Sequence, residues 1–186
     1  MIRHQRPLSK NEWLVGRAEL ILPPGRWSYR AALQQGDSAG VVLPPDSVRV
    51  GNSDGTALEL SDIALGSPGR AVSWITEVAD TVLLAPASLF RKGSEVELYF
   101  EARGATPGLM YRHEITVSRS RNRPADRKRP LVAVSFDEKA TASVIRSHRT
   151  VRLDRLKEGS YLMEVKITAP DGRSQMHRRP IRVIDR

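Results

Sequence analysis

The residues best suited to chemistry in this chain form one basic stretch at positions 118–130, which reads SRSRNRPADRKRP. Six of its thirteen residues are Arg or Lys and only one is Asp, so the stretch carries a dense positive charge. Arginine outnumbers lysine five to one, and its planar guanidinium group pairs with carboxylates or phosphates through two hydrogen bonds. We therefore expect electrostatic recognition of an anionic partner. The candidate docking residues are Arg119, Arg121, Arg123, Arg127, Lys128 and Arg129.

Three interpretations of this stretch stay open. It can be a solvated loop, a docking strip for an acidic protein surface or an anionic membrane, or a nucleic-acid-binding arm. Proteins that bind single-stranded nucleic acid stack bases on aromatic side chains, and no aromatic residue lies between Tyr111 and Phe136. The composition therefore favours the first two interpretations over nucleic-acid binding.

The distribution of charge along the chain also indicates an anionic partner. The net charge is +9, yet residues 1–91 hold nine basic and nine acidic residues. Residues 92–186 hold twenty-one basic and twelve acidic residues, so the whole excess lies in this half. A positive field of this kind favours acidic proteins, nucleic acids or anionic membrane surfaces as partners.

The motifs of common enzymes are missing from the sequence. It contains no G-x-S-x-G elbow and neither of the glycine-rich phosphate-binding patterns, G-x-x-x-x-G-K-[ST] and G-x-G-x-x-G. It has no cysteine, which excludes disulfides, thiolate metal sites and cysteine nucleophiles. We therefore expect a protein that is not an enzyme and binds no cofactor.

Three histidines are the remaining candidates for a metal site. His113, His148 and His177 lie on three different expected strands, and three imidazoles can bind zinc where strands bring them together. The nearest carboxylate, Glu114, directly follows His113, so a regular strand turns it to the opposite face. Each histidine also adjoins an arginine. We therefore expect the histidines to lie in solvated, cationic surroundings without a metal ion.

The elements that must position these side chains are short β-strands. Alternation of apolar and polar residues recurs along the chain, most clearly in SEVELYFEA at 94–102, while helical periodicity is nearly absent. Pro- and Gly-containing turn signals separate the segments, which predicts an all-β, immunoglobulin-like antiparallel β-sandwich. The basic stretch is then a hairpin loop between two strands. The other expected strands are 18–22, 26–33, 56–65, 80–86, 109–117, 131–136, 143–153, 161–168 and 177–184.

A weak internal repeat suggests two modules. LPPGRWSY at 22–29 parallels the segment around Gly159, at an offset of 134, and DSVRV at 46–50 parallels RPIRV at the C-terminal end. We therefore expect a partial β module at 1–51, followed by a full immunoglobulin-like sandwich at 52–186 that carries the basic loop 118–130. Half a sandwich cannot close its own core, so the first module needs either upstream sequence or another chain to complete it.

The three tryptophans give one more functional alternative, a carbohydrate-binding module that displays aromatic rings on one face. Such a module would use Trp13 or Trp74. Trp27 aligns with Tyr161 in the repeat, which predicts a core position for both residues.

Several phrases resemble the C-terminal β-sandwich region of bacterial secreted proteins named for a GWxTD motif. The resemblance rests on LELSDIAL at 58–65, VELYFEARG at 96–104 with Tyr111 soon after, and LKEGSYLMEVKITAPDG at 156–172. The naming motif itself is absent. The resemblance implies an extracytoplasmic, non-enzymatic module and supplies no catalytic residues.

Together these observations predict a non-catalytic accessory or scaffolding subunit that docks on a larger protein or membrane assembly. The resemblance implies the periplasm or the extracellular space. The first ten residues, MIRHQRPLSK, lack an apolar segment, so we expect no signal peptide in the chain as given, and a cytoplasmic location stays open. No apolar run approaches the roughly 20 residues that span a bilayer.

Overall fold

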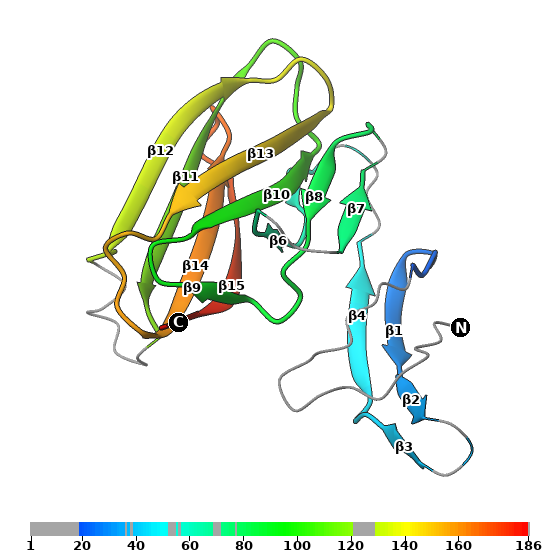
Figure 1. Ribbon diagram of the computed structural model, residues 1–186. Helices are drawn as coiled ribbons and strands as arrows, with labels where there is room; N and C mark the ends of the chain where they lie inside the picture. The colour runs from blue at the N-terminus through cyan, green and yellow to red at the C-terminus, as the bar shows by residue number, and fades with distance from the viewer. Residues whose placement is uncertain are drawn as a thin grey trace. The chain divides into compact units, whose positions relative to one another are not determined.

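The computed structural model describes residues 19–35, 37, 39–51, 55, 57–68, 72–76, 78–120 and 129–185 (Figure 1). The chain divides into two compact units: Ala18–Asp54 forms the N-terminal unit, and the other, the C-terminal unit, contains Gly55–Arg186. Strands and turns account for the regular structure of the described residues, so the all-β fold expected from the sequence is confirmed. Among these residues, no helix is long and apolar enough to cross a membrane.

The C-terminal unit is a β-sandwich of two sheets, which confirms the expected immunoglobulin-like architecture. In the four-stranded sheet, β10 lies between β13 on one side and the two short strands β5 and β6 on the other. The bounds of these strands are Glu59–Leu60 for β5, Ala64–Gly66 for β6, Glu95–Arg103 for β10 and Val144–Arg152 for β13.

The five-stranded sheet has the order β12-β11-β14-β15-β9. Its strands pair antiparallel except for β9, which runs parallel to β15, a pairing that the sequence pattern does not predict. A short hairpin, β7 with β8, belongs to the same unit. The bounds are Ser73–Ile75 for β7, Thr81–Leu83 for β8, Leu89–Arg91 for β9, Met110–Arg119 for β11, Val132–Lys139 for β12, Gly159–Thr168 for β14 and Ser174–Ile184 for β15.

The core fills the space between these two sheets. Strand β10 buries Val96, Leu98, Phe100 and Ala102 in this core, because successive side chains of a strand point to opposite faces; Tyr99 is buried on the other face. The same alternation holds on β14, where the odd-numbered residues from Tyr161 to Ile167 are buried. The buried residues that β10, β11 and β14 contribute include Val96, Leu98, Phe100, Ile115, Val117, Met163, Val165 and Ile167.

His113 does not lie in the solvated, cationic surroundings that we expected. Its side chain is 0% exposed and stacks on Phe136, with a distance of 4.7 Å between the ring centroids, while Phe100 lies 5.9 Å away. The reason is the strand period, which places His113 on the core-facing side of β11 together with Tyr111 and Ile115. Burial lowers the pKa of His113, because the charged imidazolium would lose its hydration there.

The N-terminal unit contains two small antiparallel pairs. β1 (Gly25–Tyr29) pairs with β4 (Asp46–Val50), and β2 (Ala32–Gln35) pairs with β3 (Ala39–Val42). Trp27, on β1, is 37% exposed, so its expected core position is wrong for this structure, whereas its counterpart Tyr161 is 1% exposed. The sequence repeat cannot predict this difference, because burial depends on a covering layer that the repeat does not encode.

Candidate functional site

The basic loop joins two neighbouring strands at one end of the sandwich. Strand β11 ends at Arg119 and β12 begins at Val132, and both flanks are fixed by backbone hydrogen bonds, from Ser120 N to Ser160 O and from Leu131 N to Val117 O. Arg119 and Arg129 are exposed at these flanks. The other four candidate docking residues, Arg121, Arg123, Arg127 and Lys128, lie outside the described residues.

Three further segments bring cations to the same end. Backbone hydrogen bonds from Lys92 N to Ile184 O and from Leu153 N to Ser94 O join the β9–β10 turn to the C-terminal strand and to the β13–β14 connection. Sequence reasoning missed these residues, since they are far apart along the chain and only the sheet topology gathers them. The exposed, described cations of this surface, hereafter the basic end, are Arg91, Lys92, Arg119, Arg129, Arg155, Lys157 and Arg182.

The cations of the basic end are not neutralised within the described part of the chain. None of them forms an ion pair there, and the carboxylates of Glu95 and Asp154 pair instead with Arg152, at 3.7 Å and 3.4 Å. An exposed surface with unpaired cations attracts anions, and this attraction weakens with increasing salt concentration.

The outer face of the five-stranded sheet shows the opposite arrangement. Lys166 lies 3.3 Å from Glu114, and Arg178 donates to Glu164 at 2.7 Å. In these cross-strand pairs a negative charge neutralises each positive charge, so they attract an anionic partner less than the unpaired cations of the basic end do. Glu114 also faces away from the buried His113, as the strand period predicts.

The described aromatic side chains at the basic end are unavailable for stacking. Phe90, on β9, and Tyr161, at the start of β14, are each only 1% exposed. The hydroxyl of Tyr161 is also engaged, because it donates to the carbonyl of Lys157 at 2.7 Å. This part of the surface therefore offers charge without an aromatic platform.

A second candidate site is a hollow of about 540 Å³ beside the β7–β8 hairpin. Trp74, which is half-buried, forms one wall and meets Tyr99 edge-to-face, with 5.3 Å between the ring centroids. The hollow is also lined by Asp62 and Arg179, which form an ion pair at 3.4 Å, and by Glu101. A mixture of ring surface, donors and acceptors of this kind suits a small polar ligand.

The chemistry of this hollow is dominated by Tyr99. Its hydroxyl donates to Glu101 Oε1 at 2.8 Å. Burial, and then this bond to a carboxylate, raise the pKa of Tyr99 to about 12, so the phenol stays protonated at neutral pH. Arg146 and Arg103 hold the same Glu101 carboxylate, at 3.5 Å and 3.3 Å. Tyr99, Glu101, Arg103 and Arg146 therefore form one connected network of polar side chains.

The three histidines considered as zinc ligands are not brought together. His113 is in the core, His148 lies on β13 of the other sheet, and His177 is opposite Val165 on β15. Nδ1 of His148 forms a hydrogen bond with Asp80 Oδ2 at 3.0 Å, and Glu97 Oε2 lies 3.9 Å from Nε2, so the surroundings of this histidine are acidic and not cationic as we expected. Within the described ranges, no cluster of three histidines and carboxylates is arranged to hold a metal ion.

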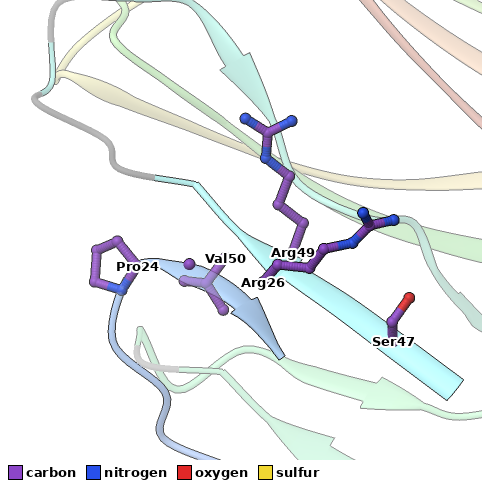
Figure 2. A pocket seen from close by; sticks show the side chains of 6 residues that line it. Pro24, Arg26, Ser47, Arg49 and Val50 are labelled. Atoms are coloured by element: carbon purple, nitrogen blue, oxygen red, sulfur yellow. The ribbon is translucent and has the colours of Figure 1, made fainter. Parts of the chain in front are cut away.

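An open hollow also lies on the N-terminal unit (Figure 2). Arg26 on β1 and Arg49 on β4 are directly opposite each other in the antiparallel register, and both side chains line this hollow with Ser47. Directly opposed like charges repel each other, and the same hollow is also lined by Pro24 and Val50.

Comparison with known proteins adds little to this geometry. No family model matches the chain, and no curated protein matches it. Among solved structures, the chain is similar to the soluble domain of PmoD from Methylocystis sp. ATCC 49242 (Rockwell). That similarity has 12% sequence identity and a TM-score of 0.38, and it covers 66% of this chain and 89% of the PmoD domain. The class of protein is therefore defined by the fold itself, as an all-β protein with a sandwich unit.

Proposed function

We propose that the protein is a non-catalytic accessory subunit that docks through its basic end on an acidic surface of a larger protein assembly. The observation that supports this most directly is the contrast in pairing. Described cations at the basic end have no carboxylate partner, whereas Lys166 and Arg178 on the adjacent sheet face are paired. Electrostatic complementarity of this kind gives specificity and a fast association rate.

An acidic protein surface fits the basic end better than a nucleic acid or a membrane does. Arginine predominates in the basic loop, and the bidentate geometry of its guanidinium group suits carboxylates and phosphates alike, so the aromatic residues decide between the three partners. Base stacking and insertion into a bilayer interface both use exposed aromatic residues, and the described aromatics of this end, Phe90 and Tyr161, are buried. In this proposal the sandwich is a rigid frame for the charged end, and it works outside the cytoplasm, in the periplasm or the extracellular space.

Amine-specific cross-linking of the native extract tests the docking surface. Lys92 and Lys157 lie on the basic end, while Lys166 lies on the outer sheet face and Lys139 lies where β12 ends. We expect cross-links from the first two lysines to carboxylate-rich segments of one partner complex, and none from the other two lysines. Cross-links spread evenly over all four would contradict the proposal.

Matched charge variants complete the test. Changing Arg155 and Lys157 to Ala removes two unpaired cations, and we expect the partner complex to be lost at physiological salt. Changing Lys166 and Arg178 to Ala removes two paired cations and serves as the control. Binding that survives the first change, binding that nuclease abolishes, or binding to anionic vesicles instead of protein would each overturn the docking role proposed here.

A carbohydrate-binding function is the second candidate, and the hollow beside Trp74 is the observation that favours it. The indole forms a wall next to polar side chains that can bond to sugar hydroxyls, including Ser61 and Asp62. Fluorescence titration with soluble glycans would show a shift that is lost in Trp74→Phe and retained in Trp27→Phe. An unchanged spectrum across neutral and acidic glycans would exclude this function.

A further inference from the structure

Polar contacts join an edge strand of one sheet of the sandwich to an edge strand of the other. Strand β12 is the edge of the five-stranded sheet, and β13 is the edge of the four-stranded sheet. From β13, Arg149 donates to Glu138 Oε2 at 3.1 Å, and the Ser147 hydroxyl donates to the same oxygen at 3.0 Å. Both donors act on one carboxylate of β12, so Glu138 joins the two edge strands.

A buried histidine lies next to this carboxylate. His113 on β11 is opposite Phe136 of β12 in the antiparallel register, and the two rings stack with an angle of 8° between their planes. His113 Nε2 is 3.8 Å from Glu138 Oε2, which is too long for a hydrogen bond. Neither ring nitrogen has a partner among the described residues, although a buried neutral imidazole carries one N–H donor. His113 is therefore an unused donor beside a carboxylate that other residues hold.

The other strands around the ring supply apolar side chains. Phe100 of β10 lies 5.9 Å from it, and Ile167 of β14 is its opposite residue in the register. Arg112 and Glu114, its neighbours on β11, point to the other face of the sheet. Burial is the main obstacle to charging the ring and lowers its pKa, so the imidazole is neutral at neutral pH. The charged groups nearest the ring are Glu138 and Asp137 on β12 and Arg149 on β13.

We propose that His113 is an acid-sensitive switch for the β12 edge: a protonated His113 draws Glu138 away from Arg149 and Ser147, so that β12 loses its contact with β13 and opens at the edge of the sheet. The movement required is small, because a charge-assisted hydrogen bond needs Glu138 Oε2 only about 1 Å closer to the ring. The Glu138 side chain is 28% exposed and can turn. This switch does not depend on the docking function proposed above.

The direction of the pH response follows from where the proton binds better. In the closed state the buried ring takes up a proton poorly, whereas a hydrated imidazole in the open state has a pKa of about 6.5. A fall in pH below about 6.5 therefore favours the open state, and a rise in pH restores the closed state. Strand β12 is the element that yields, because five of its eight residues are exposed and none is fully buried.

Hydrogen exchange of the full chain at pH 7.5 and pH 5.0, corrected for the intrinsic pH dependence of exchange, tests this switch. We expect the protection of the β12 amides to fall at least ~10-fold at the lower pH, while the amides of β14 keep theirs. Strand β14 lies between β11 and β15 and serves as the internal reference. Unchanged protection of β12, or an equal loss in both strands, would overturn the proposal.

Two histidine variants assign the response to one residue. His113→Phe keeps a ring that stacks on Phe136 but cannot take up a proton, so protection of β12 should no longer depend on pH. His177→Gln removes a histidine from β15, which is not a neighbour of β12, and should keep the wild-type response. A response that persists in His113→Phe, or one that His177→Gln abolishes, would contradict the assignment.

Side-chain NMR of the unmodified chain gives a second measurement that no folding defect of a variant can disturb. We expect the imidazole signals of His113 to titrate below the usual pH for histidine. The carboxylate signal of Glu138 and the guanidinium signals of Arg149 should change with the same midpoint, because one proton moves all three groups. A His113 ring that stays neutral while β12 loses protection, or midpoints that differ, would overturn the proposal.

Discussion

Trp27 and Tyr161 occupy the same position in two copies of one β-hairpin, yet only Tyr161 is buried. The local sequence determines the hairpin, the glycine before the aromatic residue and the hydrogen bond to the carbonyl four residues earlier. Burial depends on a second layer of strands, which the sandwich supplies to Tyr161. The β1–β4 hairpin therefore keeps the local geometry of β14–β15 although no opposite sheet buries its aromatic residue.

Replacing Gly104 should destabilise the fold strongly, because a side chain there would overlap the backbone of another segment. Gly108 serves as the comparison, since a side chain there would cause backbone strain without overlap. Both Gly104 and Gly108 have positive φ angles, 75° and 91°. A Cβ at Gly104 would overlap the carbonyl group of Ala57, whereas a Cβ at Gly108 meets nothing within 4 Å. We expect Gly108→Ala to cost about 1 kcal/mol from backbone strain alone and Gly104→Ala to cost several times more.

Urea unfolding of the two glycine variants measures this difference. Equal losses of unfolding free energy would show that the loop moves freely away from Ala57. A larger loss in Gly104→Ala, with an unchanged slope against urea, would show that the contact between these two segments is rigid.

His113 should make the stability of the protein depend on pH. Burial lowers its pKa, a change that nearby Glu138 opposes and Arg149 supports, and neither ring nitrogen has a hydrogen-bond partner among the described residues. Because the pKa in the folded state lies below its unfolded value of about 6.5, the stabilising contribution is complete above that pH. It is lost as the pH falls toward the lower, folded-state pKa.

The variant His113→Phe removes this dependence. The new ring can stack on Phe136 as the imidazole does, without two unsatisfied nitrogens, so we expect about 1 kcal/mol of added stability at neutral pH. Unfolding free energies measured between pH 5 and pH 8 should vary less in the variant. A parallel pH profile in both proteins would assign the dependence to another group.

The structures of β10 and of His113 on β11 show which features of the fold a single sequence can predict. The alternation of Val96, Leu98 and Phe100 predicted a strand and its buried face, because a period of two requires only local geometry. The same period in β11 already placed His113 with Tyr111 and Ile115, but the adjacent arginine outweighed it in our interpretation.

Long-range topology was not accessible from the sequence. Lys92, Arg155 and Arg182 converge with the basic loop because β9, β14 and β15 are neighbours in one sheet. No local pattern encodes the parallel pairing of β9 with β15, since it joins segments about ninety residues apart. The basic loop was therefore visible in the sequence, and the surface around it was not.

Tyr99 should stabilise the fold at neutral pH, and this contribution to the free energy of unfolding should be lost at strongly alkaline pH. Its pKa is raised to about 12, mainly by burial and then by its bond to Glu101, whereas the unfolded value is about 10. A raised folded-state pKa gives stability that is complete below pH 10 and is lost as the pH rises toward 12. Tyr99→Phe should cost about 1 kcal/mol at neutral pH and flatten the alkaline limb of the stability profile. A steep alkaline limb in the variant would contradict this assignment.

Arg149 should stabilise the contact between β13 of the four-stranded sheet and β12, the edge strand of the five-stranded sheet. Its guanidinium lies 4.6 Å from the centroid of the Phe136 ring and donates to Glu138 Oε2 at 3.1 Å, so one side chain on β13 holds two residues of β12. Arg149→Met keeps the apolar stem but leaves Glu138 with a single donor, the hydroxyl of Ser147. We expect a loss of about 1–2 kcal/mol in unfolding free energy, since a partly buried carboxylate loses its cation.

The charge of Arg149 also lowers the pKa of His113, so removing this charge should weaken the dependence of stability on acid pH that His113 causes. A double-mutant cycle between Arg149→Met and His113→Phe measures this coupling at pH 5.5, and additive effects there would show that the two side chains act independently.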